Sequence, residues 1–345
     1  MNEHSRREFL WRALPGAAVA GAGLTMLHPW VSFAASAQLQ PGKAERGYTA
    51  GKYALEIDGQ FAGWIESVEG GQATSEGATG RPGLEQKRVP IVKYEDIRVN
   101  YGTGMSRNFY EWIQASLEGR LSRKSGAVIA CDYDFREKSR MVWNNAVITE
   151  VAFPACDASS KDAAKMSITF SPEAIREQTT PRGGPTYSAG GRSAQMMQKR
   201  WLPANFRLQI DGLEAACTRV NKIEAIVVGQ GRSKGYEARG MAGGLQASNL
   251  VVTLPEADAA AFQKWHEGLR TEGKGIMGGG RERNGTLAYL TPDLREALFT
   301  LTFRNLMVSK LAPERTQAGG ENIRRAMVEM TYQGLAFAHG PAAWG

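Results

Sequence analysis

The chain has 345 residues, of which 42% are hydrophobic and 22% charged, a composition typical of a soluble protein with two or three domains. Its formal net charge of +7 is a mild excess of Lys and Arg spread along the chain, which permits anionic partners but requires none. Only four histidines are present, and two of them, His4 and His28, lie in the N-terminal leader described next. This scarcity excludes multi-histidine metal sites and leaves little material for imidazole catalysis.

The leader, residues 1–37, has the pattern of a twin-arginine export signal: a charged start, a weakly apolar stretch over 13–27 and an A-x-A cleavage site. The residues that carry the pattern are Arg6, Arg7, Phe9, Leu10, Ala35 and Ala37. Trp11 stands where this signal usually has Lys, and an apolar stretch of about fifteen residues is too short to span a bilayer as a helix. We expect export through the twin-arginine translocase to the periplasm or the cell exterior. An amphipathic N-terminal helix or a membrane anchor is the alternative.

Three cysteines, Cys131, Cys156 and Cys217, are too few and too irregularly spaced for a disulfide framework or a zinc site. We expect them to be small buried apolar residues. A protein that folds in the reducing cytoplasm before export does not need disulfides.

The rest of the chain contains an internal repeat. Residues 53–59 (YALEIDG) recur 153 positions later as 206–212 (FRLQIDG). The same offset relates Ile97 and Val99 to Leu250 and Val252, and Phe109 and Trp112 to Phe262 and Trp265. At slightly larger offsets Gly126 matches Gly285, Trp143 matches Phe303, and Thr169–Phe170 match Thr331–Tyr332. Six matches in one order predict two copies of one unit, with a small insertion near 278–280 in the second.

In the first copy, period-two alternation over 53–57 and the Asp58–Gly59 turn predict a β-hairpin that continues over 61–68. A Gly-rich loop, Glu69–Lys87, and a strand ending near Val99 follow. Ser106 is placed to cap a helix that Gly119 ends. Three strands complete the unit, near 127–132, 141–151 and 165–170.

The second copy repeats this order, with a hairpin from residue 206, a loop over Gly229–Gly244, and a helix that begins near Pro255 and has Phe262, Trp265 and Leu269 on one face. We therefore predict a mainly β chain with one helix per unit (α+β), divided into domain 48–177, linker 178–200 and domain 201–340. Residues at equivalent places in the two copies are expected to form the cores: Ile57, Phe109, Trp112, Trp143, Ile210, Phe262, Trp265 and Phe303.

The order of hairpin, long loop, strand, helix with "FYEWI" and strand with "WNNA" resembles the tail tube proteins of contractile phages, the T4-type family to which type VI secretion tubes are similar. The resemblance covers 48–177 fully and 201–339 more weakly. It implies two tandem β-barrel or sandwich domains that assemble edge to edge into a six-fold ring, with the long loops (69–87 and 229–244) contributing to ring stacking. Two such domains per chain imply a trimer with pseudo-six-fold symmetry.

Two features depart from this family, because tube proteins normally lack an export signal and tubes that carry DNA tend to have acidic lumens. The leader and the basic charge therefore favour an exported ring or tail-like scaffold, and we predict no nucleic-acid partner. Other tail or injection-system components are possible partners.

Three segments of the chain resemble motifs of enzymes or metal sites. Gly231–Gly235 matches G-x-S-x-G around Ser233, with Asp258 or Asp293 and then His339 downstream, so an exported serine hydrolase is an alternative. The glycines that follow Ser233 favour a loop over the helix that a nucleophile needs. Residues 268–275 fall one residue short of a phosphate-binding loop, and Asp132, Asp134 and Glu137 are more typical of a turn than of a metal site. A two-domain adhesive or carbohydrate-binding module is a third alternative. We predict no catalytic residue, metal or cofactor.

Overall fold

The computed structural model describes residues 51–75, 92–180, 184–187, 201–229, 245–271, 282–314 and 324–344. The chain divides into two compact units, Met1–Gly47 and Tyr48–Gly345, and every described residue belongs to the second. The leader lies outside the described residues, as do most of both predicted long loops. Within the described ranges, no helix has the length and apolar character needed to cross a membrane.

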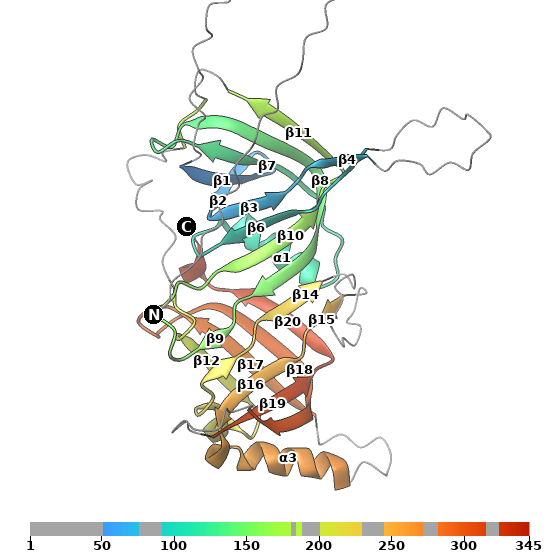
Figure 1. Ribbon diagram of the computed structural model, residues 1–345, viewed down its shortest axis with the longest axis vertical. Helices are drawn as coiled ribbons and strands as arrows, with labels where there is room; N and C mark the ends of the chain where they lie inside the picture. Colours follow the sequence, from blue (N-terminus) through green and yellow to red (C-terminus); the bar gives the residue numbers. More distant parts are fainter. Residues whose placement is uncertain are drawn as a thin grey trace, which may run out of the picture. The chain divides into compact units, whose positions relative to one another are not determined.

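The N-terminal set of elements, β1 to β11 with α1, is mainly β as predicted (Figure 1). Its elements are β1 (Lys52–Ile57), β2 (Gln60–Ile65), β3 (Ser67–Gly70), β4 (Ala73–Ser75), β5 (Val92–Tyr94), β6 (Ile97–Tyr101), α1 (Arg107–Leu117), β7 (Lys124–Cys131), β8 (Glu137–Phe153), β9 (Cys156–Asp157), β10 (Met166–Ser171) and β11 (Ala174–Thr179). The sequence pattern missed β11, which runs past the predicted start of the linker at residue 178.

The C-terminal set, β12 to β20 with its helices, is also mainly β. It consists of β12 (Phe206–Ile210), α2 (Glu214–Cys217), β13 (Lys222–Ile223), β14 (Ile226–Gly229), β15 (Gln246–Ala247), β16 (Leu250–Pro255), η1 (Glu256–Asp258), α3 (Ala260–Thr271), β17 (Arg283–Leu290), β18 (Ala297–Pro313), β19 (Arg325–Thr331), β20 (Gly334–His339) and η2 (Pro341–Ala343).

The two sets share one order of strand pairing. In the N-terminal set the antiparallel pairs are β1–β7, β7–β8, β8–β10, β8–β11, β10–β6 and β6–β3. In the C-terminal set they are β12–β17, β17–β18, β18–β19, β18–β20, β19–β16 and β16–β13. Both central strands, β8 and β18, are 17 residues long. The strands of these six pairs in the N-terminal set therefore have structural equivalents in the C-terminal set.

Registers agree as well as topology. Ile57 lies opposite Gly126 and Gly126 opposite Trp143, while Ile210 lies opposite Gly285 and Gly285 opposite Phe303. A bulge precedes each of these glycines, and Asn145 and Asn305 both have a positive φ, of 49° and 56°. Asparagine is one of the few residue types that adopts this backbone region readily.

Two sequence-based expectations for the C-terminal set are wrong. No hairpin follows β12: the helix α2 replaces the equivalent of β2, since Glu-Ala-Ala is a good helix former and buries Ala216 and Cys217. The structural equivalent of Phe170 is Met330 and not Tyr332, because β10 and β19 pair with the central strands around the same bulge. The Tyr332 ring nevertheless lies 5.0 Å from Phe303, much as the Phe170 ring lies 4.9 Å from Trp143. The two rings therefore make the same aromatic contact from different strand positions.

Helix α1 begins and ends where its sequence predicts. The Ser106 side chain accepts a hydrogen bond from the Phe109 amide, and Gly119, with a φ of 75°, follows the last turn. The eight expected core residues are all buried, and the Trp112 and Trp143 rings stack with centroids 5.9 Å apart. The helix thus fixes itself to the central strand by aromatic packing.

Gly126 is expected to be intolerant of a side chain. An added Cβ would lie 2.0 Å from the Glu56 carbonyl oxygen and 2.6 Å from the Trp143 ring, so Gly126→Ala should lower the free energy of unfolding by about 3 kcal/mol or more. Gly268→Ala is the control, because nothing lies within 4 Å of its Cβ and alanine favours the helix by up to about 1 kcal/mol. Chemical denaturation measures both, and equal stability of the two variants would contradict the crowded bulge.

Candidate assembly surface

The residues of the enzyme-like motif are not seen together in the described part of the chain. Ser233 lies outside the described residues, and its predicted partners are engaged elsewhere. Asp293 accepts hydrogen bonds from the Thr291 hydroxyl and the Arg295 amide, while Nδ1 of His339 accepts one from Trp344 at 2.9 Å. Burial lowers the pKa of His339. No three His, Cys, Asp or Glu residues of the described ranges gather as metal ligands would.

The acidic residues between β7 and β8 stabilise a turn. The Asp132 carboxylate accepts hydrogen bonds from the amides of Arg136 and Asp134, both at 2.9 Å. The bond from the Arg136 amide, followed by the interaction with Lys138, lowers the pKa of Asp132. The three cysteines are free and buried, and burial raises their pKa to about 11 for Cys131 and Cys217 and about 12 for Cys156. At neutral pH they are thiols, as expected for packing residues.

A buried ion pair lies on the outer face of the β1–β7–β8 sheet. Glu137, 3% exposed, accepts two hydrogen bonds of 2.8 Å from Arg140 and one of 2.9 Å from the Tyr187 hydroxyl. The Arg140 hydrogen bonds are the main cause of the lowered pKa of Glu137. Residues 184–187 pair here with the start of β8, as Gly184 donates to the Glu137 carbonyl and Tyr187 to that of Phe135. The pair therefore fastens the chain beyond β11 to the sheet.

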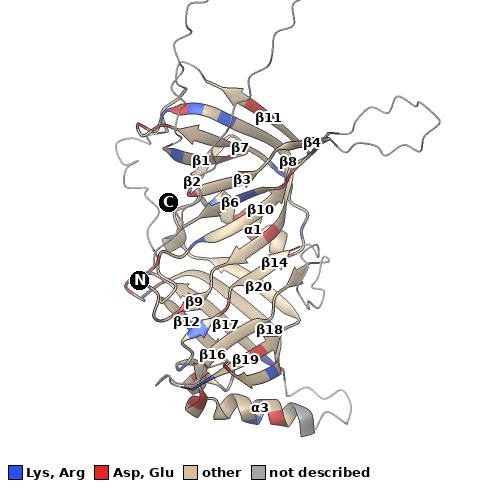
Figure 2. Ribbon diagram, viewed as in Figure 1, with Lys and Arg blue, Asp and Glu red and all other residues tan. Residues whose placement is uncertain are grey.

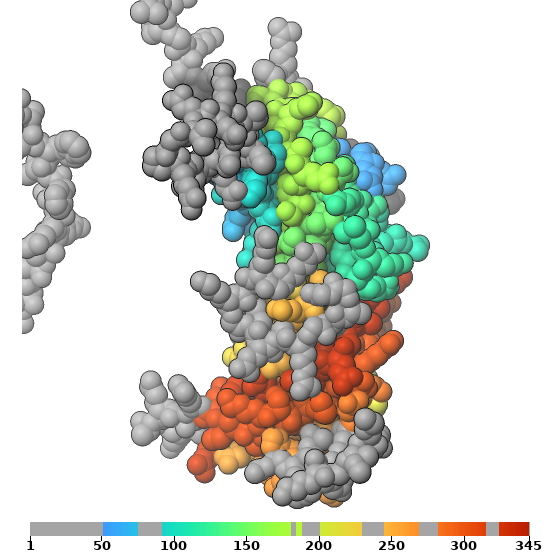
Figure 3. Space-filling model, turned by 90° about the vertical axis from the view of Figure 1, so that its right-hand side faces the viewer, coloured from blue at the N-terminus to red at the C-terminus, as the bar shows by residue number. Residues whose placement is uncertain are grey.

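The two sets join through an exchange of strands, which we call the inner junction. β14 pairs with the end of β8, with Val228 opposite Val151 and Gly229 opposite Glu150. In return β9 pairs with β13. The sheet is thus continuous from one set to the other, and the space-filling view shows their surfaces in contact (Figure 3).

Aromatic side chains fill the inner junction. The Tyr110 ring lies 5.3 Å from Phe299 and 5.4 Å from His339, and its hydroxyl donates to the Ala343 carbonyl. Phe153 packs 5.5 Å from Phe337, and the Tyr289 hydroxyl donates to the Pro154 carbonyl. Burial raises the pKa of Tyr110 and of Tyr289.

Sequence reasoning missed the junction residues, although the repeat carried a signal for them. At the structural equivalents of Tyr110, Phe299 and Phe337 the other copy has Gln263, Ser139 and Glu177. An aromatic residue in one copy that is polar in the other marks a surface that only one copy buries.

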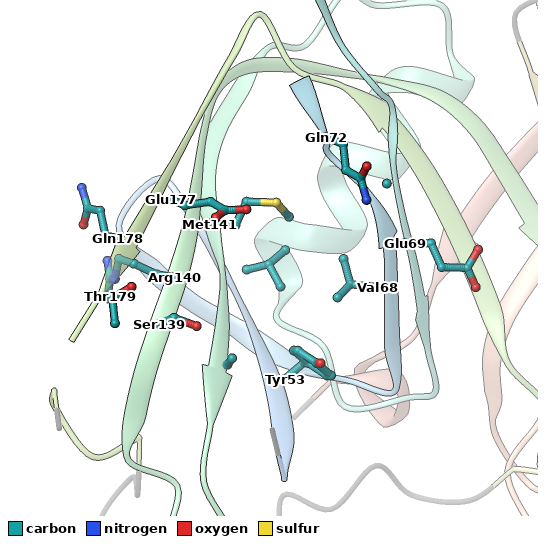
Figure 4. Close-up of a pocket in the computed structure, with 13 residues that line it drawn as sticks. Tyr53, Val68, Glu69, Gln72, Ser139, Arg140, Met141, Glu177, Gln178 and Thr179 are labelled. Carbon is teal, nitrogen blue, oxygen red and sulfur yellow. The ribbon is translucent and has the colours of Figure 1, made fainter. Parts of the chain in front are cut away.

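Among the described residues, one edge of the N-terminal set has no such partner. β4, which Figure 1 labels, forms a separate two-stranded sheet with β5. Beside it, a pocket of about 640 Å³ opens between β1, β3, β7, β8 and β11. Figure 4 shows Val68, Met141 and Glu177 around it, each from a different strand. Charged residues of both signs are interspersed over the strands in Figure 2, without one dominant basic face in that view.

Glu137→Gln is expected to destabilise the fold by about 3 kcal/mol at pH 7, because it removes the nearest and most buried counter-ion of Arg140 and leaves only Glu56, at 3.8 Å. The lowered pKa means that the wild-type pair stabilises the fold above the carboxyl's ordinary titration range and loses this effect as the pH falls through the folded-state pKa. The difference between variant and wild type should therefore shrink on acidification. Glu173→Gln, whose exposed partner is Arg123, is the control, with an expected change below about 1 kcal/mol. Urea denaturation at pH 7 and pH 3 measures both variants, and a pH-independent difference would contradict the role of the charge.

Comparison with known proteins finds one family model that is similar to the N-terminal set. Residues 49–176 match the model of the T4-like virus tail tube protein gp19. No curated protein sequence matches the chain.

Several solved structures are similar at low identity. A chain of the PVC sheath-tube complex of an extracellular contractile injection system, in its extended state, is 17% identical, with 40% of this chain and 95% of that chain covered and a TM-score of 0.34. Hcp1 from Flavobacterium johnsoniae is 17% identical, covering 37% and 96%, with a TM-score of 0.28. The tube-terminating cap of the anti-feeding prophage is 16% identical, covering 42% and 99%, with a TM-score of 0.34.

The family match ends at residue 176, within β11. It therefore includes neither residues 184–187 nor the C-terminal set. It confirms, for residues 49–176, the resemblance to the T4-like tail tube protein family that the order of sequence motifs indicated.

Proposed function

We propose that this protein is a non-enzymatic structural subunit of a tail-tube-like assembly of the kind found in contractile injection systems. The family match over 49–176 is the observation that carries the proposal. The second copy supports it, because the C-terminal set repeats the strand pairing and registers of the N-terminal set, as expected for a tandem duplication of one tube domain.

The assembly that we propose is a ring of three chains. The inner junction joins two equivalent domains through different surfaces, the β8 end of one and the β14–β15 hairpin of the other. Such a heterologous contact forms a closed ring when the rotation that it repeats divides a full turn. If six domains close the ring, as in the family that the sequence resembles, three chains supply them. Sheath-like, baseplate-like or cap-like proteins are the expected further partners.

Export of the folded chain is the second part of the proposal. Its support is the leader, with Arg6 and Arg7 before Phe9 and Leu10 and the A-x-A site at Ala35 and Ala37. The assembly would then form in the periplasm or outside the cell. The basic net charge does not match the acidic lumens that are typical of tubes that carry DNA, and we propose no nucleic-acid cargo.

The ring predicts a defined mass. Protein beginning at Gln38 should give the mass of three chains in native mass spectrometry, and negative-stain images should show rings with six similar lobes. Dilution in increasing salt tests whether the complex dissociates directly to single chains, as equivalent contacts require. A monomer that persists over a wide concentration range would sink the proposed assembly.

The export signal predicts a clear loss of transport. Lys in place of both Arg6 and Arg7 should leave the precursor in the cytoplasm, because the translocase reads the arginine pair. Arg12→Lys lies outside the pair and is the matched control, with normal export expected. Fractionation and immunoblotting measure both, and export of the double variant would overturn this route.

A further inference from the structure

The inner junction has an unfilled counterpart on the same molecule. Its elements come from two sides: the β8 end and α1 from the N-terminal set, and the β14–β15 hairpin with β20 from the C-terminal set. Because the two sets share their topology, each of these elements has an equivalent in the opposite set. Those equivalents are the β18 end, α3, the β4–β5 hairpin and β11.

The hairpins match residue by residue. Val228 lies opposite Ala247 in β14–β15, and Ala73 lies opposite Tyr94 in β4–β5. Ala247 precedes the first residue of β16 by the same three positions that separate Tyr94 from β6. The matched register makes Ala73 the equivalent of Val228 and Thr74 the equivalent of Gly229. On the other side, Leu311 and Lys310 of β18 are the equivalents of Val151 and Glu150 of β8.

Both counterparts are open edges. The β8 end pairs with β10 on one side and with β14 on the other, whereas the β18 end, among the described residues, pairs with β19 alone. The β4–β5 hairpin likewise pairs with no third strand of the described chain. Edge strands present free amide and carbonyl groups that accept a further strand.

The pocket of the N-terminal set lies where the inner junction is filled with aromatic rings. Phe299, Phe337 and Tyr289 have as equivalents Ser139, Glu177 and Ala130, and all three of these smaller or polar residues line the pocket. In the C-terminal set this space receives Tyr110 of α1 and the chain around Pro154. The pocket is therefore shaped to receive a helix and a strand end from a unit of the same fold.

Charge complementarity favours a second copy as the occupant. Glu177 is exposed at the pocket, and Glu69 is exposed on the outer side of β3, while Lys264 on α3 and Lys310 on β18 are exposed on the elements that would dock there (Figure 4). Arg140, which also lines the pocket, is already paired with Glu137. The inner junction, by contrast, is apolar and buried.

We infer that the C-terminal set of a second copy docks on the N-terminal set, with its β18 end paired along β4 and its α3 over the pocket. Ala73 then lies opposite Leu311 of the second copy, and Thr74 opposite Lys310. We call this contact between two chains the outer junction. It rests on the proposed ring and specifies which surfaces of neighbouring chains meet in it. Being polar and ionic, it weakens as salt rises, while the inner junction persists.

Mixed cysteine variants test the register. Chains with Ala73→Cys and chains with Leu311→Cys are mixed at high salt, brought to low salt and oxidised. Directly opposed cysteines have the Cα spacing that a disulfide requires, so the mixture should shift to a two-chain band on a non-reducing gel. Each variant alone should remain a single chain, because the native cysteines are buried and a heterologous contact brings different residues together.

The matched control is Ala312→Cys mixed with Ala73→Cys, because neighbouring residues of a strand point to opposite faces and this pair should lose the cross-link. Complexes of three chains without the cross-link would overturn the outer junction and leave the proposed ring intact. Cross-linking of Ala73→Cys with itself would overturn the heterologous contact. Single chains at every concentration would overturn the junction and the ring together.

Discussion

The long strand β8 serves two sheets at once, and the other elements of the N-terminal set take their places from it. Its first half pairs with β7 and β11 and its second half with β10 and β14. Gly126 of β7, beside the bulge, leaves room for the Trp143 ring of β8, because no side chain fits between that ring and the Glu56 carbonyl. Trp143 in turn stacks on Trp112 and fixes α1. A strand shared in this way couples the barrel-like packing of one domain to the strand that arrives from the next.

The sequence predicted those elements whose structure depends on neighbouring residues. Alternation over 53–57 predicted β1, and the Ser106 cap and Gly119 bounded α1, because caps and turns depend on neighbouring residues alone. The repeat located the buried rings of both cores, since burial selects residue types at fixed positions. Short strands such as β9, β13 and β15 have two residues each and no period to read, so their pairing across the sets was not predictable.

The hairpin expected after β12 shows a second limit. Its first strand repeats the sequence of β1 closely, but Glu214–Cys217 then form a helix that buries Ala216 and Cys217. Local propensity there outweighed the homology of the preceding strand. The candidate surface was predictable only in outline. The family resemblance implied an edge-to-edge assembly. The difference between Tyr110 and Gln263 at one helical position identifies a contact surface only when the partner surface is known.

The inner junction also has a kinetic consequence. Because both of its halves belong to one chain, their encounter depends on the tether and not on protein concentration. In a ring built from such chains, only the contacts between chains form by diffusion. Three molecules then have to meet instead of six separate domains, so the kinetic order of assembly is lower. In the proposed ring the tether would also alternate two chemically different contacts, an apolar one that is permanent and a polar one that is reversible. Opening and closing would then occur at every second boundary, so the unit that is added or lost is always a pair of domains.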